Sequence, residues 1–295
     1  MFRRSLAAVL AAAIALLPST ALAWGSSAHR GIMRRAIDIL PPEIKPFFVA
    51  HRDELVYRSI DPDTWRTVGW DEERNHFVNF GAPELGRSGT EMPRDYSVAL
   101  QRFGPALLGR LGTLPWREAE MFGNLQRSFE SMSKGNGWAP QDIVLFSAAA
   151  SHYVQDATQP LHASNNYDGQ LSGQRGVHSR FEAELFERFE SRLTLTPAPP
   201  KAFASPRDFA FDTLLASFQK VDAVLRADKD AIGDKDTYDD AYFESFFVNV
   251  KPLLEERLSA AITATASVIV SAWEQAGRPA LTLPPRPPQK VQRTR

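Results

Sequence analysis

Apolar residues recur at helical spacing along most of this 295-residue chain. In the stretch SSAHRGIMRRAIDIL, for example, they fall on one face of a helix that Pro41 and Pro42 would end. The alternation typical of β-strands is scarce. The same spacing predicts further helices over residues 95–111, 115–133, 140–158, 176–193, 206–228, 237–249 and 251–277. We therefore expect an all-α fold, a single compact multi-helix domain.

The loops between these helices are rich in proline and glycine, as over residues 62–69 and 165–176. The sequence has no internal repeat, so we assign residues 24–280 to one helical domain. A hydrophobic content of 43% is ample for its core, and the balance of 34 basic and 35 acidic residues argues against broad electrostatic binding to nucleic acid. Residues 281–295 read as a disordered, proline-rich basic tail.

Residues 1–23 have the pattern of a secretory signal peptide. Two early arginines precede an apolar run that is shorter than the roughly 20 residues needed to span a bilayer. Small residues at Ala21 and Ala23 then suggest cleavage before Trp24. We expect an exported protein, periplasmic or secreted. The chain has no cysteine, so its core, bound metal or both must stabilise it outside the cell.

Polar residues interrupt one of the most apolar predicted helices, in the segment SHYVQDATQPLH. His152 and Asp156 are four residues apart and therefore share a face of the helix 140–158. That face also carries apolar residues, which points it inward. Pro160 ends the helix, and the following turn brings His162 back towards the same region.

A second pair, His178 and Glu182, repeats the four-residue spacing, and His29 lies on the apolar stripe of its own helix. A single inward histidine is usually a hydrogen-bonded core residue. Inward carboxylates beside inward histidines, however, need a compensating cation, because burying an unpaired carboxylate costs several kcal/mol. Imidazole and carboxylate donors without thiolate suit zinc, although manganese or iron accept similar ligands. His51 lies among charged residues and reads as a surface residue.

Taken together, these positions resemble the zinc-dependent phospholipase C family, which shares its helical fold with single-strand-specific zinc nucleases. The resemblance implies a trinuclear zinc cleft between helices, holding three zinc ions as cofactors. Nothing after about residue 195 contributes to it. The pattern that carries the resemblance consists of Trp24, His29, Asp63, His76, His152-x3-Asp156, His162 and His178-x3-Glu182.

The resemblance assigns the ligands to three sites. One site takes Asp63, His76, His152 and Asp156, and a second takes His162, His178 and Glu182. The third takes the free amine and carbonyl of Trp24, together with His29 and a bridging oxygen of Asp156, so that it depends on cleavage after Ala23. Asp63 is also the implied catalytic residue, orienting or deprotonating the attacking water. Asp61, in the same loop, stays open as the alternative to Asp63.

The chemistry expected of such a centre is hydrolysis of a phosphoric ester by metal-activated water. We expect phospholipase C-type cleavage of phospholipid, with Phe77, Asn79 and Asn165 contacting substrate. The partner is then a phospholipid headgroup at a membrane surface. We expect a monomer with no obligate protein partner.

Two alternatives to this function remain. A single-strand nuclease or 3′-nucleotidase of the same superfamily would take single-stranded nucleic acid or a nucleotide, and Phe77 and Asn79 would suit a base. One observation also argues against a phosphatidylcholine enzyme. Choline-specific phospholipases place an acid and two aromatic residues around the headgroup, and this sequence has Ser27, Thr64 and Glu73 at those positions. The third reading, a non-catalytic zinc-binding protein, is disfavoured by the complete ligand set.

Overall fold

The computed structural model describes residues 24–281, which form helices and connecting loops without a β-strand, so the all-α prediction is confirmed for this part of the chain. The predicted signal peptide, residues 1–23, lies outside the described residues, as does the predicted tail from residue 282 onwards. The helices are α2 (Ser26–Asp38), α3 (Lys45–Ala50), α4 (Arg52–Arg58), α5 (Asp61–Thr67), η1 (Glu73–His76), η2 (Pro83–Leu85), α6 (Tyr96–Leu111), α7 (Leu114–Ser133), α8 (Ala139–Thr158), η3 (Pro160–Ala163), α9 (Val177–Ser179), η4 (Arg180–Glu184), α10 (Leu185–Phe189), η5 (Glu190–Arg192), α11 (Pro206–Phe218), α12 (Val221–Ile232) and α13 (Asp240–Gln275).

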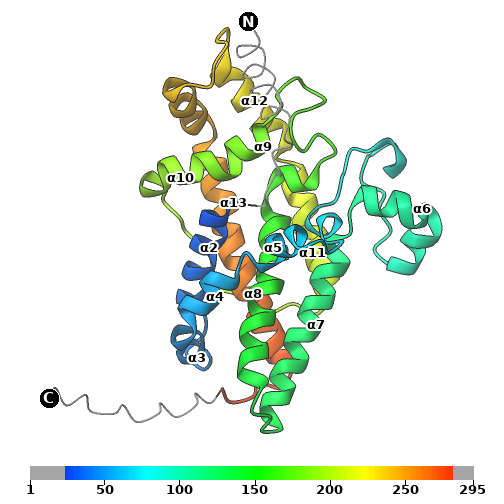
Figure 1. The fold of residues 1–295 in the computed structure, drawn as a ribbon, viewed down its shortest axis with the longest axis vertical. Coiled ribbons are helices and arrows are strands. Elements are labelled where there is room, and N and C mark those ends of the chain that lie inside the picture. Colours follow the sequence, from blue (N-terminus) through cyan, green and yellow to red (C-terminus); the bar gives the residue numbers. More distant parts are fainter. Residues whose placement is uncertain (1–23, 282–295) are drawn as a thin grey trace, which may run out of the picture.

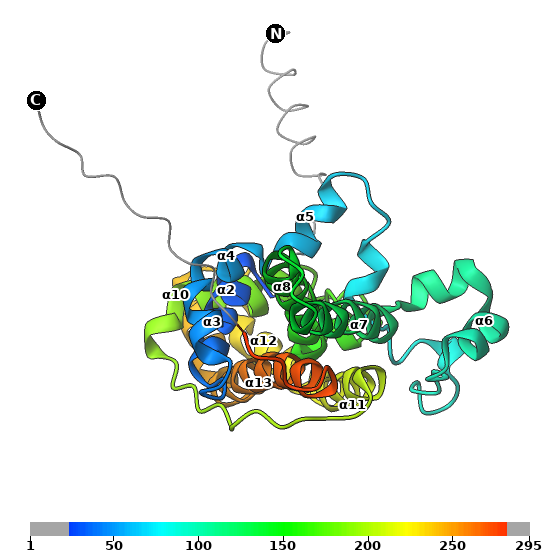
Figure 2. The ribbon, with the colours of Figure 1, turned by 90° about the horizontal axis from the view of Figure 1, so that it is seen from below.

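Helices α8 and α13 form the centre of the molecule (Figure 1). Helix α7 packs along α8, and α2, α11 and α12 pack around this centre, as the end-on view in Figure 2 shows. A large apolar cluster joins these helices, and it includes Trp24, Phe181 and Phe246. Helix α8 is buried along almost its whole second half, from Ser147 to Thr158, so polar residues on it lie inside the protein.

A smaller lobe built on α6 projects from the side of this bundle (Figures 1 and 2). A second apolar cluster lies beneath it, where residues such as Leu108 and Leu111 meet Phe211 and Leu214 of α11. The lobe places η1 against α7 and α8, since the backbone N–H groups of Asn79 and Thr113 donate to the carbonyls of Leu111 and Arg74.

The helices differ from the sequence prediction in several places. Helices α3 and α4 occupy residues 45–58, where no helix was predicted. The stretch 62–69, predicted as a loop, is mostly helix α5. The stretch 206–228, predicted as one helix, is split into α11 and α12 at Gln219 and Lys220, although both residues favour helix. In contrast, α13 runs unbroken through Pro252. Proline removes the hydrogen bond to the carbonyl four residues earlier, and here that carbonyl belongs to Val248, which is exposed to water.

An extended segment, residues 194–203, crosses the outer side of α13 on its way to α11 and is called the strap below (Figure 2). Its backbone N–H groups donate to side-chain oxygens that recur every fourth residue along α13. Four residues of helix rise about 6 Å, close to the length of two extended residues. The donors on the strap are accordingly two residues apart, except for one step of three between Ala198 and Lys201. The pairs are Thr194 with Glu255, Thr196 with Ser259, Ala198 with Thr263, Lys201 with Ser267, and Phe203 with Ser271.

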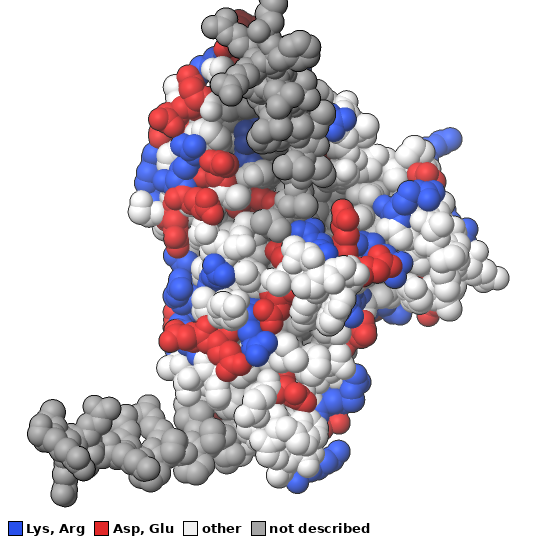
Figure 3. Space-filling view, viewed as in Figure 1, with Lys and Arg blue, Asp and Glu red and all other residues white. Residues whose placement is uncertain are grey.

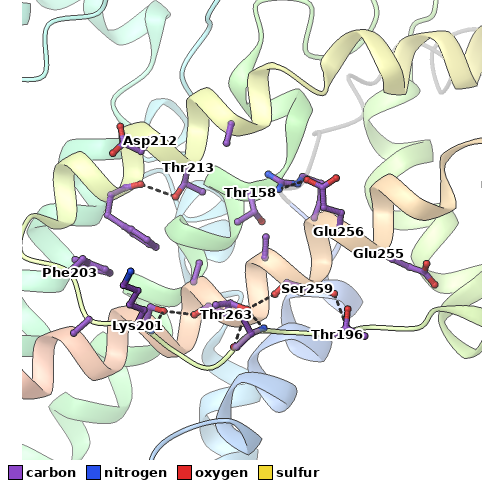
Figure 4. A pocket seen from close by; sticks show the side chains of 18 of the residues that line it. Thr158, Thr196, Lys201, Phe203, Asp212, Thr213, Glu255, Glu256, Ser259 and Thr263 are labelled. Atoms are coloured by element: carbon purple, nitrogen blue, oxygen red, sulfur yellow. Dashed lines mark hydrogen bonds and ion pairs between the residues drawn. The ribbon is translucent and has the colours of Figure 1, made fainter.

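The strap closes one side of a cavity of about 980 Å³ between α11 and α13 (Figure 4). Its lining includes Phe203, Phe209 and Thr213, and it contains none of the nine predicted metal donors. The prolines of the strap, Pro197, Pro199 and Pro200, occupy positions that donate no backbone hydrogen bond to α13. They favour the extended conformation that the strap adopts.

The strap predicts a stability effect. In Ser267→Ala the N–H of Lys201 loses its acceptor, so the free energy of unfolding should fall by about 1–2 kcal/mol. Thr263→Ser keeps the hydroxyl that accepts from Ala198 and should change the free energy by less than about 0.5 kcal/mol. Urea denaturation of both variants measures the difference, and equal stabilities would refute the ladder of hydrogen bonds.

Candidate metal centre

The eight predicted metal donors that follow Trp24 come from six parts of the chain and meet inside the protein. These residues are at most 4% exposed, so water cannot stabilise their charge. They are His29 on α2, Asp63 on α5, His76 at the end of η1, His152 and Asp156 on α8, His162 on η3, and His178 and Glu182 on α9 and η4.

Asp156 lies at the centre of this cluster. Its Oδ2 is 2.9 Å from His76 Nδ1 and 3.3 Å from His152 Nε2. Its Oδ1 is 3.4 Å from His29 Nε2 and 4.0 Å from His162 Nδ1. One carboxylate therefore faces histidines from four different elements, and its two oxygens address different pairs of them.

Asp63 lies near two of the same histidines. Its Oδ1 lies 3.8 Å from both His76 Nδ1 and His152 Nε2. Asp61, the alternative from the sequence, instead accepts a hydrogen bond of 3.1 Å from Arg58. The structure thus brings Asp63, and not Asp61, to the histidines.

His162, His178 and Glu182 form the other end of the cluster. Glu182 Oε2 lies 2.9 Å from His178 Nε2 and 3.7 Å from His162 Nε2, and the two Nε2 atoms are 3.2 Å apart. The residues Arg180–Glu184 form a π-helical turn, a feature that is frequent at functional sites and that the sequence did not indicate.

Backbone carbonyls fix three of the rings. The Nδ1–H of His152 donates to Ser59 O (2.9 Å), that of His162 to His76 O (2.6 Å) and that of His178 to Tyr167 O (2.9 Å). In each ring the proton on Nδ1 leaves the lone pair of Nε2 directed at the cluster, the arrangement that a metal-ligating imidazole needs.

Several buried polar atoms of the cluster have no hydrogen-bond partner within the described residues. Such atoms are costly unless a cation or another group compensates them. Imidazole and carboxylate donors without thiolate fit zinc. The unpartnered atoms are His29 Nε2, both carboxylate oxygens of Asp63, His76 Nε2 and Asp156 Oδ1. The residues present therefore fit divalent metal ions, and three groups of them could each hold one.

In each of these groups the donor atoms lie within 4.8 Å of one another. The group of His162, His178 and Glu182 has the membership that the resemblance implies. The other two groups share His152 and differ from the predicted sets. One joins His29 with Asp63 and His152, where the resemblance places Trp24 and Asp156, and the other joins His76, His152 and Asp156 without Asp63. The groups are His29, Asp63 and His152; His76, His152 and Asp156; and His162, His178 and Glu182.

Trp24 is buried beside this cluster. Its indole N–H donates to Gln155 O (2.9 Å) and to the hydroxyl of Thr158 (3.2 Å), both on α8. The next residue, Gly25, packs so closely on η4 that an added Cβ would lie 2.8 Å from the Cβ of Ala183. The start of α2 is thereby held against the helices that carry the donors. Ligation by the amine and carbonyl of Trp24 stays a prediction.

Two glutamines that the sequence analysis did not select position the donors. Gln155 Oε1 lies 2.6 Å from His29 Nδ1, and its amide donates to Thr265. The amide of Gln159 donates to Glu182 Oε2 (3.0 Å). Residues 152, 155, 156 and 159 share one helical face, so their spacing could have identified both glutamines.

A buried network behind His76 and His152 was also missed. The hydroxyl of Tyr153 donates to Glu72, and Arg117 bonds both of these residues, with its Nη2 3.0 Å from Glu72 Oε2. The ring of Tyr153 lies 5.6 Å from those of His76 and His152. The network therefore limits how far either imidazole can move.

The predicted substrate-binding residues also make hydrogen bonds that stabilise the fold. The amide of Asn79 donates to Arg110 O (2.7 Å), and that of Asn165 donates to Gly81 O (3.1 Å). Phe77 is half-buried, and its carbonyl accepts from Leu114. Their contact with substrate stays a prediction.

The ionisation of the cluster follows from its charges. Burial alone would lower the pKa of His152, but the carboxylates of Asp156 and Asp63 outweigh it and raise this pKa to about 9. Burial would likewise raise the pKa of Asp156, yet His152 and His162 hold it well below its usual range. Burial prevails at His76 and lowers its pKa. Without metal, a proton on His152 thus supplies part of the positive charge that the carboxylates require.

His51, interpreted from the sequence as a surface residue, is half-buried instead. It lies between α3 and α4, with its ring 4.7 Å from that of Phe47. The charged residues next to His51 in the sequence had favoured a surface position and gave no sign of its contact with Phe47. His51 belongs to none of the three groups of donors.

A search of curated proteins found no significant match. The sequence model of zinc-dependent phospholipase C matches residues 28–250, a range that holds every predicted donor except Trp24. This match covers most of the chain and agrees with the buried clusters of imidazole and carboxylate groups. The chain belongs to the zinc-dependent phospholipase C family.

Proposed function

We propose that this protein is an exported phospholipase C that hydrolyses the phosphodiester of a phospholipid by direct attack of water, with Asp63 as the catalytic residue. The observation that carries the proposal is the position of Asp156, whose two oxygens face different pairs of buried histidines. Such an arrangement suits several adjacent cations. Adjacent cations in turn suit a phosphodiester, which gains negative charge as it reacts.

The residues of the centre have different roles in the reaction. Zinc, when bound, supplies positive charge to the phosphate oxygens and lowers the pKa of water towards 7. His76, His152, His162 and His178 present neutral nitrogens to hold it. Asp63 Oδ2 has no hydrogen-bond partner and can accept the proton of the attacking water. Arg66, with Nη2 3.2 Å from Asp63 Oδ1, restrains that carboxylate.

The three positions that surround choline in choline-specific phospholipases do not form that cage here. Of the three positions concerned, Ser27 donates to Glu187 (3.0 Å), Thr64 donates to Ile60 O (3.2 Å), and Glu73 is exposed. None of them is aromatic. We therefore propose a phospholipid headgroup that other contacts recognise.

The part of the surface that Figure 3 shows agrees better with a lipid substrate than with a nucleic acid. On the face shown in Figure 3, outside the grey atoms, basic and acidic side chains are interspersed. A path for a single strand would instead gather positive charge along a groove. A nuclease of this superfamily is thus the second candidate.

We further propose that the protein is exported through the signal peptide predicted over residues 1–23, which are outside the described residues. Cleavage before Trp24 would free the amine that completes the third ligand set. Within residues 24–281, no helix is both long and apolar enough to cross a bilayer.

A substrate panel with matched variants tests this function. The wild type should hydrolyse phosphatidylethanolamine or phosphatidylcholine vesicles and bis-p-nitrophenyl phosphate, and should leave single-stranded DNA and a 3′-nucleotide intact. Asp63→Asn removes the proton acceptor, so the rate on the phosphodiesters should fall by about 10²–10⁴-fold. Asp61→Asn should keep the wild-type rate, because Asp61 pairs with Arg58.

Three outcomes would contradict the proposal. DNA cleavage without lipid hydrolysis would make the protein a nuclease. Loss of rate in Asp61→Asn, with Asp63→Asn unaffected, would move the catalytic role to Asp61. Metal binding without turnover on any of these substrates would leave a non-catalytic zinc-binding protein.

Zinc binding should release protons at neutral pH. The pKa of His152 in the metal-free protein is about 9, so this ring carries a proton at pH 7 that must leave before the nitrogen can bind zinc. Titration calorimetry in buffers of different ionisation enthalpy counts the protons. We expect at least one per chain at pH 7, falling as the pH rises through about 9. A heat of binding independent of the buffer at pH 7 would contradict this protonation state.

A further inference from the structure

The turn after α5 exposes two large apolar side chains to water. Val68 is 64% exposed and Trp70 is 59% exposed. They flank Gly69, whose φ of +86° makes the turn and is a backbone angle that favours glycine. These three residues, Val68–Trp70, are called the α5 tip below. Leaving a tryptophan and a valine side by side in water is unfavourable, which suggests that a partner covers them.

The tip is held in place and does not trail from the protein. The N–H of Trp70 donates to Trp65 O (3.2 Å), and the two indole rings are 5.5 Å apart. Trp65 packs in turn on the main apolar cluster, and the guanidinium of Arg117 lies 5.9 Å from its ring centre. The exposed ring of Trp70 therefore has a fixed base.

The same segment borders the metal centre at both of its ends. Asp63 lies two residues before Trp65 on α5, so the backbone of Trp70 is on the order of 10 Å from that of Asp63. On the other side, the N–H of Glu72 donates to Trp70 O (2.8 Å), and Glu72 holds Tyr153 beside the histidines. In Figure 2, α5 and the segment after it stand out from the body of the helices.

We propose that the α5 tip inserts into the lipid–water interface of a phospholipid bilayer and thereby seats the metal centre at the level of the headgroups. Tryptophan prefers this level of a bilayer, where its ring is partly in lipid and its N–H remains hydrated. The proposal rests on the proposed function and adds the surface by which the enzyme reaches aggregated substrate.

The test compares vesicles with a monomeric substrate. In the double variant Val68→Ser and Trp70→Ala, the rate on phosphatidylethanolamine–phosphatidylcholine vesicles below saturation should fall about tenfold, as expected for losing the transfer of one large side chain into lipid. The rate on bis-p-nitrophenyl phosphate should be unchanged, because neither residue contacts the donors.

A matched control is Trp138→Ala. Trp138 is 55% exposed, but it lies in the turn between α7 and α8, about 20 Å along α8 from His152 (Figure 1). This variant should keep the wild-type rate on vesicles. A second readout needs no turnover: bromine on the lipid acyl chains should quench wild-type tryptophan emission within the first moments of mixing, and the double variant should lose that quenching.

The outcomes distinguish a failure of this inference from a failure of the proposed function. Vesicle hydrolysis and quenching that survive in the double variant would overturn the inference. A parallel loss on both substrates would also overturn it, because the residues would then act on the centre and not on the membrane. Cleavage of single-stranded DNA that depends on Trp70, without quenching by vesicles, would make the tip a base-stacking surface. Quenching in a wild type that hydrolyses no phospholipid would support the tip while refuting the proposed function.

Discussion

The carboxylate of Asp156 is the interaction around which the rest of the structure is arranged. It lies within 4.0 Å of imidazole nitrogens from α2, η1, α8 and η3, in a region from which water is excluded. An isolated carboxylate at this depth would be destabilising by several kcal/mol, so the fold is consistent only when positive charge gathers around it. Protons on the histidines can supply part of that charge, and divalent cations supply it more completely.

The packing of the helices serves this centre. The long helix α13 supports α8 from behind, and Thr265 of α13 bonds the glutamine that orients His29. Tyr153, Glu72 and Arg117 hold the other side. The α5 tip lies between Asp63 and Glu72 in the chain, so the segment that holds both residues also forms the surface proposed to meet the membrane. A rigid centre beside an exposed aromatic turn is a natural arrangement for chemistry on a substrate that is part of a surface.

Much of this could be predicted from the sequence, because four-residue spacing on an amphipathic helix is a local property. His152-x3-Asp156 and His178-x3-Glu182 needed no knowledge of the fold to be paired, and the family resemblance supplied Asp63 and His76. Helix α5 did leave a local signal, since Pro62 and two acidic residues lie in its first turn and Arg66 lies in its last, but the stretch was interpreted as a loop. The π-helical turn at Arg180–Glu184 depends on tertiary packing and left no local signal. The strap shows the same limit: serine and threonine every fourth residue on α13 looked like an ordinary helix face until an extended segment was found to donate to them.

The central proposal, which the family resemblance implies, is that Asp156 joins two of three neighbouring zinc sites. Its most direct test is the zinc content of the purified, folded protein, measured by mass spectrometry of the metal, in the wild type and in Asp156→Ala. The account predicts three zinc ions per chain in the wild type and one in the variant, the one held by His162, His178 and Glu182. His51→Ala, which changes a histidine outside these groups, should keep all three. Three zinc ions retained by a folded Asp156→Ala protein would contradict the account.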